Sequence, residues 1–138
     1  MENKIRLIQS KLRRFPNILA VYLFGSSVYG RKGKLSDFDV GVVFKNPEKV
    51  LVDPKKSLKI YERLFDIFIP LVKNTNHLDL VFLQKAPLAL QKEALLKGRL
   101  IYAKGKELFD YKEKTLLKYA DIKPLLSQFY QEVFQTRL

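Results

Sequence analysis

Apolar residues recur along the chain in two patterns, one typical of helices and one typical of strands. Over residues 2–14, Ile5, Ile8 and Leu12 are spaced by three and four positions, which predicts an amphipathic helix. The stretch "ILAVYLF", residues 18–24, is short and rich in branched and aromatic side chains. Such a run bounded by polar residues is typical of a buried strand, so a helix followed by a strand is expected to open the fold.

The stretch "DFDVGVVF", residues 37–44, predicts a second strand in which side chains alternate between two faces. One face carries Asp37, Asp39, Gly41 and Val43. The other face carries Phe38, Val40, Val42 and Phe44. Two carboxylates therefore lie on the same side of one strand.

The remaining pattern predicts a small α/β (α+β) domain. The further elements are a short helix at 27–31, a loop at 46–56, a helix from 57 to 68, a strand at 77–83, a helix between Pro87 and Gly98, a strand at 99–103, and helices at 106–120 and 124–136. Residues 1–138 are expected to form one domain, a small mixed sheet flanked by helices. Its core is expected at about residues 15–104, followed by C-terminal helices at about 105–138.

The charge of the chain is strongly positive, with 26 Lys and Arg against 14 Asp and Glu and a net charge of +12. Such a balance favours a phosphate-bearing partner, either a free nucleotide or RNA, although a lysine-rich surface of a heat-adapted protein would produce it too. There is no cysteine and one histidine, His77, which excludes disulfides, cysteine-ligated zinc and a multi-histidine metal site. No apolar run approaches the ~18 residues of a membrane span, and a cytoplasmic protein without membrane contact is expected.

The two aspartates of the second strand point to metal-assisted chemistry. Asp37 and Asp39 are separated by one residue, so their backbone positions lie roughly 6.5–7 Å apart on one face. Paired carboxylates of this kind suit hard cations such as Mg²⁺, and two such ions can clamp the oxygens of a phosphoryl displacement. Taken alone, Asp37 could equally be the residue with which the strand begins.

A phosphate-binding turn is expected directly after the first strand. Gly25 and Ser26 follow the apolar run and precede the predicted short helix, where backbone N–H groups can point at an anion. Arg31 and Lys32 could then help to neutralise a triphosphate. The turn and the paired aspartates together predict a nucleotide site.

A third carboxylate, Asp79, is the only acidic residue of the apolar stretch "HLDLVFL" at 77–83. A charge inside a core strand is costly unless it is paired, bound to a ligand or functional. If this strand lies beside the strand of Asp37 and Asp39, Asp79 can face the same pocket. There it could bind a metal ion and accept the proton of an attacking hydroxyl.

Two stretches of the chain resemble a known family. "GSSVYGRKGKLSDFDV" followed by "LDLVFL" resembles the nucleotidyltransferases of the DNA polymerase β superfamily, and the shortness points to the minimal nucleotidyltransferase (MNT) group. The C-terminal stretch "LLKGRLIYAKGKELFDYKEKTLLKYADIKPLLSQFYQEVF" resembles the MntA-type antitoxins of HEPN–MNT toxin–antitoxin pairs. Many relatives carry arginine shortly after Gly-Ser, whereas this chain has Ser27, Val28 and Tyr29 there.

The resemblance implies an adenylyltransferase (AMPylator) that uses Mg²⁺, expected as two ions, and ATP as its substrate. Such proteins attach AMP to a tyrosine of the cognate HEPN ribonuclease toxin and so neutralise it. Gly25 and Ser26 would bind the triphosphate, with Arg31 or Lys32 in place of the missing arginine. The metal ligands would be Asp37, Asp39 and Asp79, and Asp79 would also serve as the base.

Two other functions remain open from the sequence. The chain could be a binding-only antitoxin with a vestigial nucleotide site, although three intact carboxylates argue against decay. It could also modify an RNA end or a small molecule such as an aminoglycoside. The net charge of +12 favours RNA, but the chain lacks the added domains of such enzymes.

Overall fold

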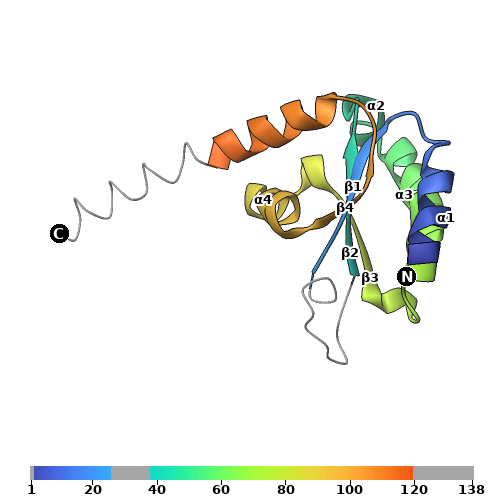
Figure 1. The fold of residues 1–138 in the computed structure, drawn as a ribbon. Coiled ribbons are helices and arrows are strands. Elements are labelled where there is room, and N and C mark those ends of the chain that lie inside the picture. Colours follow the sequence, from blue (N-terminus) through green and yellow to red (C-terminus); the bar gives the residue numbers. More distant parts are fainter. Residues whose placement is uncertain (1, 26–37, 120–138) are drawn as a thin grey trace.

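The computed structural model describes residues 2–25 and 38–119, which form three layers with a mixed sheet in the middle (Figure 1). The strands are β1 (Ile18–Phe24), β2 (Phe38–Phe44), β3 (Leu78–Phe82) and β4 (Arg99–Ala103). The helices are α1 (Glu2–Leu12), α2 (Glu48–Leu51), α3 (Pro54–Phe68), α4 (Leu88–Lys97) and a helix at 107–119. The expected small mixed sheet flanked by helices is confirmed.

The described strands lie in the order β3-β2-β1-β4. β1 is antiparallel to both of its neighbours, β2 and β4, whereas β2 and β3 run parallel. A parallel pair requires a crossover connection, and α2 and α3 provide it between β2 and β3. β3 is first in this order, so it lies at one edge of the described sheet, and α3 precedes it in the chain.

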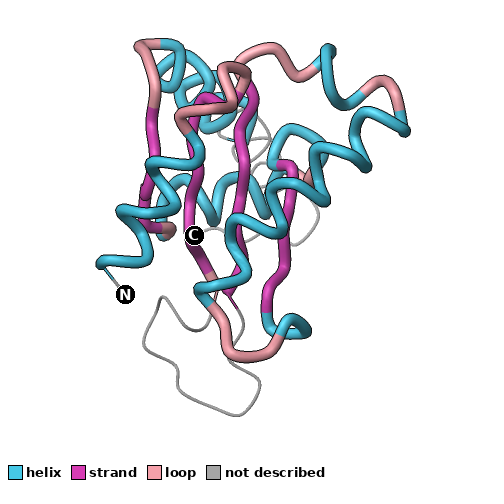
Figure 2. The backbone as a smooth tube through the Cα atoms, turned by 90° about the vertical axis from the view of Figure 1, so that its right-hand side faces the viewer, coloured by secondary structure: helices cyan, strands magenta, loops and turns pink. Residues whose placement is uncertain are grey.

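The two faces of the sheet are covered by different helices. α1 and α3 pack on one face, where Ile5, Ile8 and Leu12 of α1 join the larger core (Figure 2). α4 packs on the other face against Tyr22 and Phe24 of β1. The alternation expected for β2 is confirmed in its described part: Val40, Val42 and Phe44 belong to the α1–α3 side and Val43 to the α4 side.

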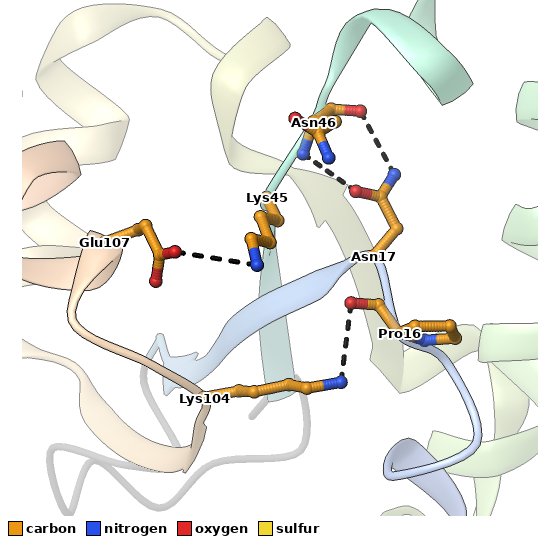
Figure 3. Close-up of polar contacts among 6 residues, drawn as sticks. All are labelled: Pro16, Asn17, Lys45, Asn46, Lys104 and Glu107. Carbon is orange, nitrogen blue, oxygen red and sulfur yellow. Dashed lines mark hydrogen bonds and ion pairs between the residues drawn. The ribbon is translucent and has the colours of Figure 1, made fainter.

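Polar contacts join neighbouring segments at the end of the sheet where β1 begins and β2 ends (Figure 3). The Asn17 side chain donates to the carbonyl of Asn46 at 3.1 Å and accepts from its backbone N–H at 2.7 Å. Lys45 lies 3.5 Å from the carboxylate of Glu107, which ties the last described helix to β2. These contacts lie at the opposite end of β2 from Asp39.

The segment 46–56, expected as a loop, is largely helical, and that prediction was wrong. Residues Glu48–Leu51 form α2, and α3 begins at Pro54 instead of residue 57. The Asp53 side chain accepts a hydrogen bond from the N–H of Lys55 at 2.9 Å. Proline at the first helical position costs no hydrogen bond, so this proline marks a helix start where the sequence interpretation took it as a loop residue.

The other expected elements are found with small shifts. β1 and β4 have the predicted bounds, α1 ends at Leu12, and β3 is shorter than the predicted 77–83 because short 3-10 turns flank it. α4 ends with Gly98 as its C-cap, as expected. The predicted helices at 27–31 and 124–136 lie outside the described residues. Within the described ranges, no helix has both the length and the apolar character that crossing a membrane requires.

Candidate active site

Two of the predicted carboxylates lie side by side on neighbouring strands. Asp39 of β2 and Asp79 of β3 are register partners in the parallel ladder. Neighbouring strands lie about 4.8 Å apart, and register partners present their side chains on the same face of a sheet. Asp39 is half-buried and Asp79 is exposed. The pairing that was conditional in the sequence is therefore present in the structure.

The glycine of the expected phosphate-binding turn lies next in the same row. Phe24, the last residue of β1, is the register partner of Asp39, and Gly25 follows it. Gly25 has a φ of 97°, in the left-handed region that favours glycine. This glycine conformation lies directly beside the carboxylate pair, at the position where the phosphate-binding turn is predicted.

Four of the predicted site residues lie outside the described residues. They are Ser26, Arg31, Lys32 and Asp37. Their roles at the site therefore stay predictions. The structure brings together Asp39, Asp79 and Gly25.

The environment of Asp79 differs from the expectation. A carboxylate in an apolar strand was expected to be buried and therefore costly, but Asp79 is exposed. The reason is that β3 is the edge strand, and its alternation turns Leu78 and Leu80 into the core and Asp79 away from it. Asp79 is thus placed without a desolvation penalty, and its position beside Asp39 is the stronger argument for a functional role.

The carboxylate pair suits a hard cation by the chemistry of its donors. Mg²⁺ prefers carboxylate oxygens, usually one or two, and completes its shell with water and substrate phosphates. Among the described residues, which leave out Asp37, no group of three His, Cys, Asp or Glu is placed to bind a metal ion. Asp39 and Asp79 fit as the described part of such a site.

A groove of about 620 Å³ lies along the outer side of β3, and its lining begins at Leu80, the residue after Asp79. We call it the α3–β3 groove. Its lining includes Ser57, Leu58 and Tyr61 of α3 and Val81, Phe82 and Lys85 at the end of β3. Burial, and secondly the charge of Asp79, raise the pKa of the Tyr61 hydroxyl.

The polymerase beta nucleotidyltransferase family model matches residues 6–107, which is most of the chain and contains all three described site residues. The chain belongs to this nucleotidyltransferase family. The family expected from the stretches "GSSVYGRKGKLSDFDV" and "LDLVFL" is thereby confirmed. A search of curated proteins finds no significant match.

Solved structures share the fold of this nucleotidyltransferase over nearly its whole length. A toxin–antitoxin structure with AMP-PNP is 23% identical with a TM-score of 0.64, covering 96% of this chain and 98% of that one. A MntA–HepT toxin–antitoxin structure is 19% identical with a TM-score of 0.63, covering 97% and 99%. A tri-AMPylated Shewanella oneidensis HEPN toxin in complex with MNT antitoxin is 18% identical with a TM-score of 0.58, covering 94% and 98%.

Sequence reasoning did not find the α3–β3 groove of this nucleotidyltransferase. Leu58 and Tyr61 belong to the helix predicted at 57–68, and helical spacing alone does not separate a residue in the core from one beside it. Leu58 is 59% exposed, while Leu64 on the same helix is fully buried. The available signal was that Leu58 has lysines close to it in the sequence, at positions 55, 56 and 59.

Proposed function

We propose that this chain is a Mg²⁺-dependent adenylyltransferase that acts in the cytoplasm as the antitoxin of a toxin–antitoxin pair. It transfers AMP from ATP to a tyrosine of a HEPN ribonuclease and thereby neutralises that toxin. The observation that carries the proposal is the register pairing of Asp39 with Asp79 beside the left-handed Gly25. Family membership and the fold shared with toxin–antitoxin complexes support it.

The reaction joins the tyrosine oxygen to the α-phosphorus of ATP. The bond between that phosphorus and the oxygen leading to the β-phosphate breaks, and pyrophosphate leaves. Asp79, exposed at the sheet edge, accepts the proton of the tyrosine hydroxyl. Bound Mg²⁺ would neutralise charge that develops on the phosphate oxygens.

Different residues would bind the metal ions and the triphosphate of ATP. Asp37, Asp39 and Asp79 would bind Mg²⁺, expected as two ions. The backbone at Gly25 and Ser26 would contact the triphosphate, with help from Arg31 and Lys32. A glycine at the end of β1 leaves room for a phosphate to approach the main chain.

Mass spectrometry tests the proposal directly. A HEPN protein encoded next to the gene for this chain is mixed with the chain, ATP and Mg²⁺, and its mass is followed. A gain in whole AMP steps that maps to a tyrosine is expected, and the Asp39→Asn variant should give none while keeping its fold by circular dichroism. Transfer at a near-normal rate by Asp39→Asn would contradict the metal-binding role of this carboxylate.

Two other outcomes would redirect the assignment. A tight complex without any mass gain would identify a binding-only antitoxin. AMP added to RNA instead of protein would favour an RNA-modifying enzyme, the function that the net charge of +12 supports. The outcomes can be told apart, because AMP-modified HEPN protein, an unmodified complex and AMP-modified RNA differ in mass or in composition.

A further inference from the structure

The α3–β3 groove lies on the side of the carboxylates from which the acceptor must arrive. Phe24 of β1, Asp39 of β2 and Asp79 of β3 are register partners across three neighbouring strands, and Gly25 directly follows Phe24. In an in-line displacement the attacking and leaving oxygens lie on opposite sides of the phosphorus. With the triphosphate bound at Gly25, the attacking hydroxyl comes from the β3 side.

The groove begins at that side. Tyr61 and Leu80 line its near end, and Asp79 is the chain neighbour of Leu80. The groove then follows α3 toward its N-terminus and β3 toward Lys85, along the edge of the sheet that Figure 2 shows from the α1–α3 side. A segment bound there would end beside Leu80, one residue along β3 from the proposed base.

The lining of the groove favours polypeptide over nucleic acid. It is mostly apolar, with Leu58 59% exposed, and Lys85 is its one cationic lining residue within the described chain. A nucleic acid strand requires a row of cations along its backbone and open aromatic faces for its bases. The ring of Tyr61 already packs against Phe65 and Phe82, with centroids 6.0 and 5.9 Å away.

The surroundings of the groove also indicate the charge of the occupant. Lys85 lines it. On the α3 side the exposed lysines Lys55, Lys56 and Lys59 outnumber the exposed acidic residues Asp53 and Glu62. No ion pair joins these lysines to an acidic group in the described ranges. Acidic residues in the bound segment would complement them. β3, an edge strand in the described sheet, can also pair with an extended main chain.

The geometry points to the α3–β3 groove as the docking site for an extended acidic and apolar segment of the protein acceptor, adjoining the tyrosine that receives AMP. This inference rests on the proposed function and adds the surface by which the acceptor is chosen. An apolar side chain of the segment covers Leu58, and the tyrosine hydroxyl reaches Asp79.

The test compares one groove variant with a matched variant elsewhere. Leu58→Glu places a charge in the groove, and Leu7→Glu makes the same change at a leucine of α1 that is 53% exposed. The acceptor probe is the neighbouring-gene HEPN protein. Steady-state AMP transfer yields KM for the acceptor and for ATP, and calorimetry measures acceptor binding in the Asp39→Asn background, where no transfer occurs.

We expect Leu58→Glu to raise the acceptor KM and Kd about tenfold or more, because a buried apolar contact is lost, with KM for ATP within about twofold. Leu7→Glu should change neither. Lys85→Glu should weaken acceptor binding, and the loss should shrink at high salt. Circular dichroism and thermal unfolding confirm that each variant is folded.

The outcomes separate this inference from the proposed function. Transfer to the HEPN protein with an unchanged acceptor KM in Leu58→Glu overturns the groove and keeps the function. If the unmodified chain binds the HEPN protein without transferring AMP, and Leu58→Glu abolishes that binding, the groove is supported and the function is refuted. If the chain neither binds the HEPN protein nor transfers AMP to it, the groove is overturned. Transfer of AMP to RNA that Leu58→Glu leaves unchanged also overturns the groove.

Discussion

Gly41 of β2 is the position at which a single added methyl group should overpack the core beneath the candidate site. It lies on the same face as Asp39, two residues further along the strand, and it pairs with Val81 of β3. A Cβ atom at this position would lie 2.8 Å from Cδ1, 2.9 Å from Cγ and 3.1 Å from Cδ2 of Leu83. Leu83 is fully buried against α4, so it has little room to move away.

Two effects of Gly41→Ala oppose each other, and their magnitudes decide the sign. Replacing a glycine in an ordinary backbone conformation stabilises a protein by about 0.4–1 kcal/mol through the unfolded state. Overpacking a core costs about 1–3 kcal/mol. Since the branch-point carbon of Leu83 clashes as well as its ends, rotation about the Cβ–Cγ bond cannot relieve the contact. We expect a net loss of about 1–2 kcal/mol in the free energy of unfolding.

Urea unfolding followed by far-ultraviolet circular dichroism measures this loss by linear extrapolation. Leu83→Ala alone should cost about 2–5 kcal/mol, because it leaves a cavity. The double variant should be less destabilised than the sum of the single variants by at least about 1 kcal/mol, since each change accommodates the other. A Gly41→Ala protein as stable as the original, or strictly additive losses, would refute the packing argument.

Three further predictions concern the base, the sheet and the pH dependence of stability. Asp79→Ala should lower the rate of AMP transfer by about 10²–10⁴-fold. Urea unfolding should stay nearly unchanged, because Asp79 is exposed. An unchanged rate of transfer would exclude Asp79 as the base. Gln84→Ala should cost about 1–3 kcal/mol in unfolding free energy, because the Gln84 amide bonds both the N–H and the carbonyl of Phe44, at 2.9 and 2.7 Å; fast amide exchange at Phe44 would accompany the loss. Burial raises the pKa of Tyr111 from 10.0 to about 12, and its hydroxyl donates to Gln91 at 2.8 Å. The neutral form is therefore favoured by the fold, and its stabilisation, about 1–2 kcal/mol, is present below pH 10 and lost as pH rises toward 12. Urea unfolding across this range should show a steeper decline for the unmodified protein than for Tyr111→Phe, and equal slopes would contradict the shift.

Much of the local structure could be predicted from the chain alone. β1 and β4 have the predicted bounds, and α4 ends at the predicted glycine. β1 and β4 are short stretches rich in apolar residues, and α4 lies between a proline and a glycine, so these signals lie within the elements or at their ends. The prediction was wrong at 46–56, where proline was taken as a loop signal although Asp53 and Pro54 start a helix. Proline supports both outcomes, and its neighbours decide between them.

The site was only partly predictable. The local sequence placed Gly25 at the end of a strand and Asp39 on one face of the next, because both depend on residues nearby in the chain. Asp79 lies forty positions from Asp39, and its pairing with Asp39 depends on β3 docking parallel to β2 after the crossover through α3. Only the tertiary structure decided that register, the exposure of Asp79 at the sheet edge and the α3–β3 groove. All three arise from contacts between distant segments, which no local periodicity reports.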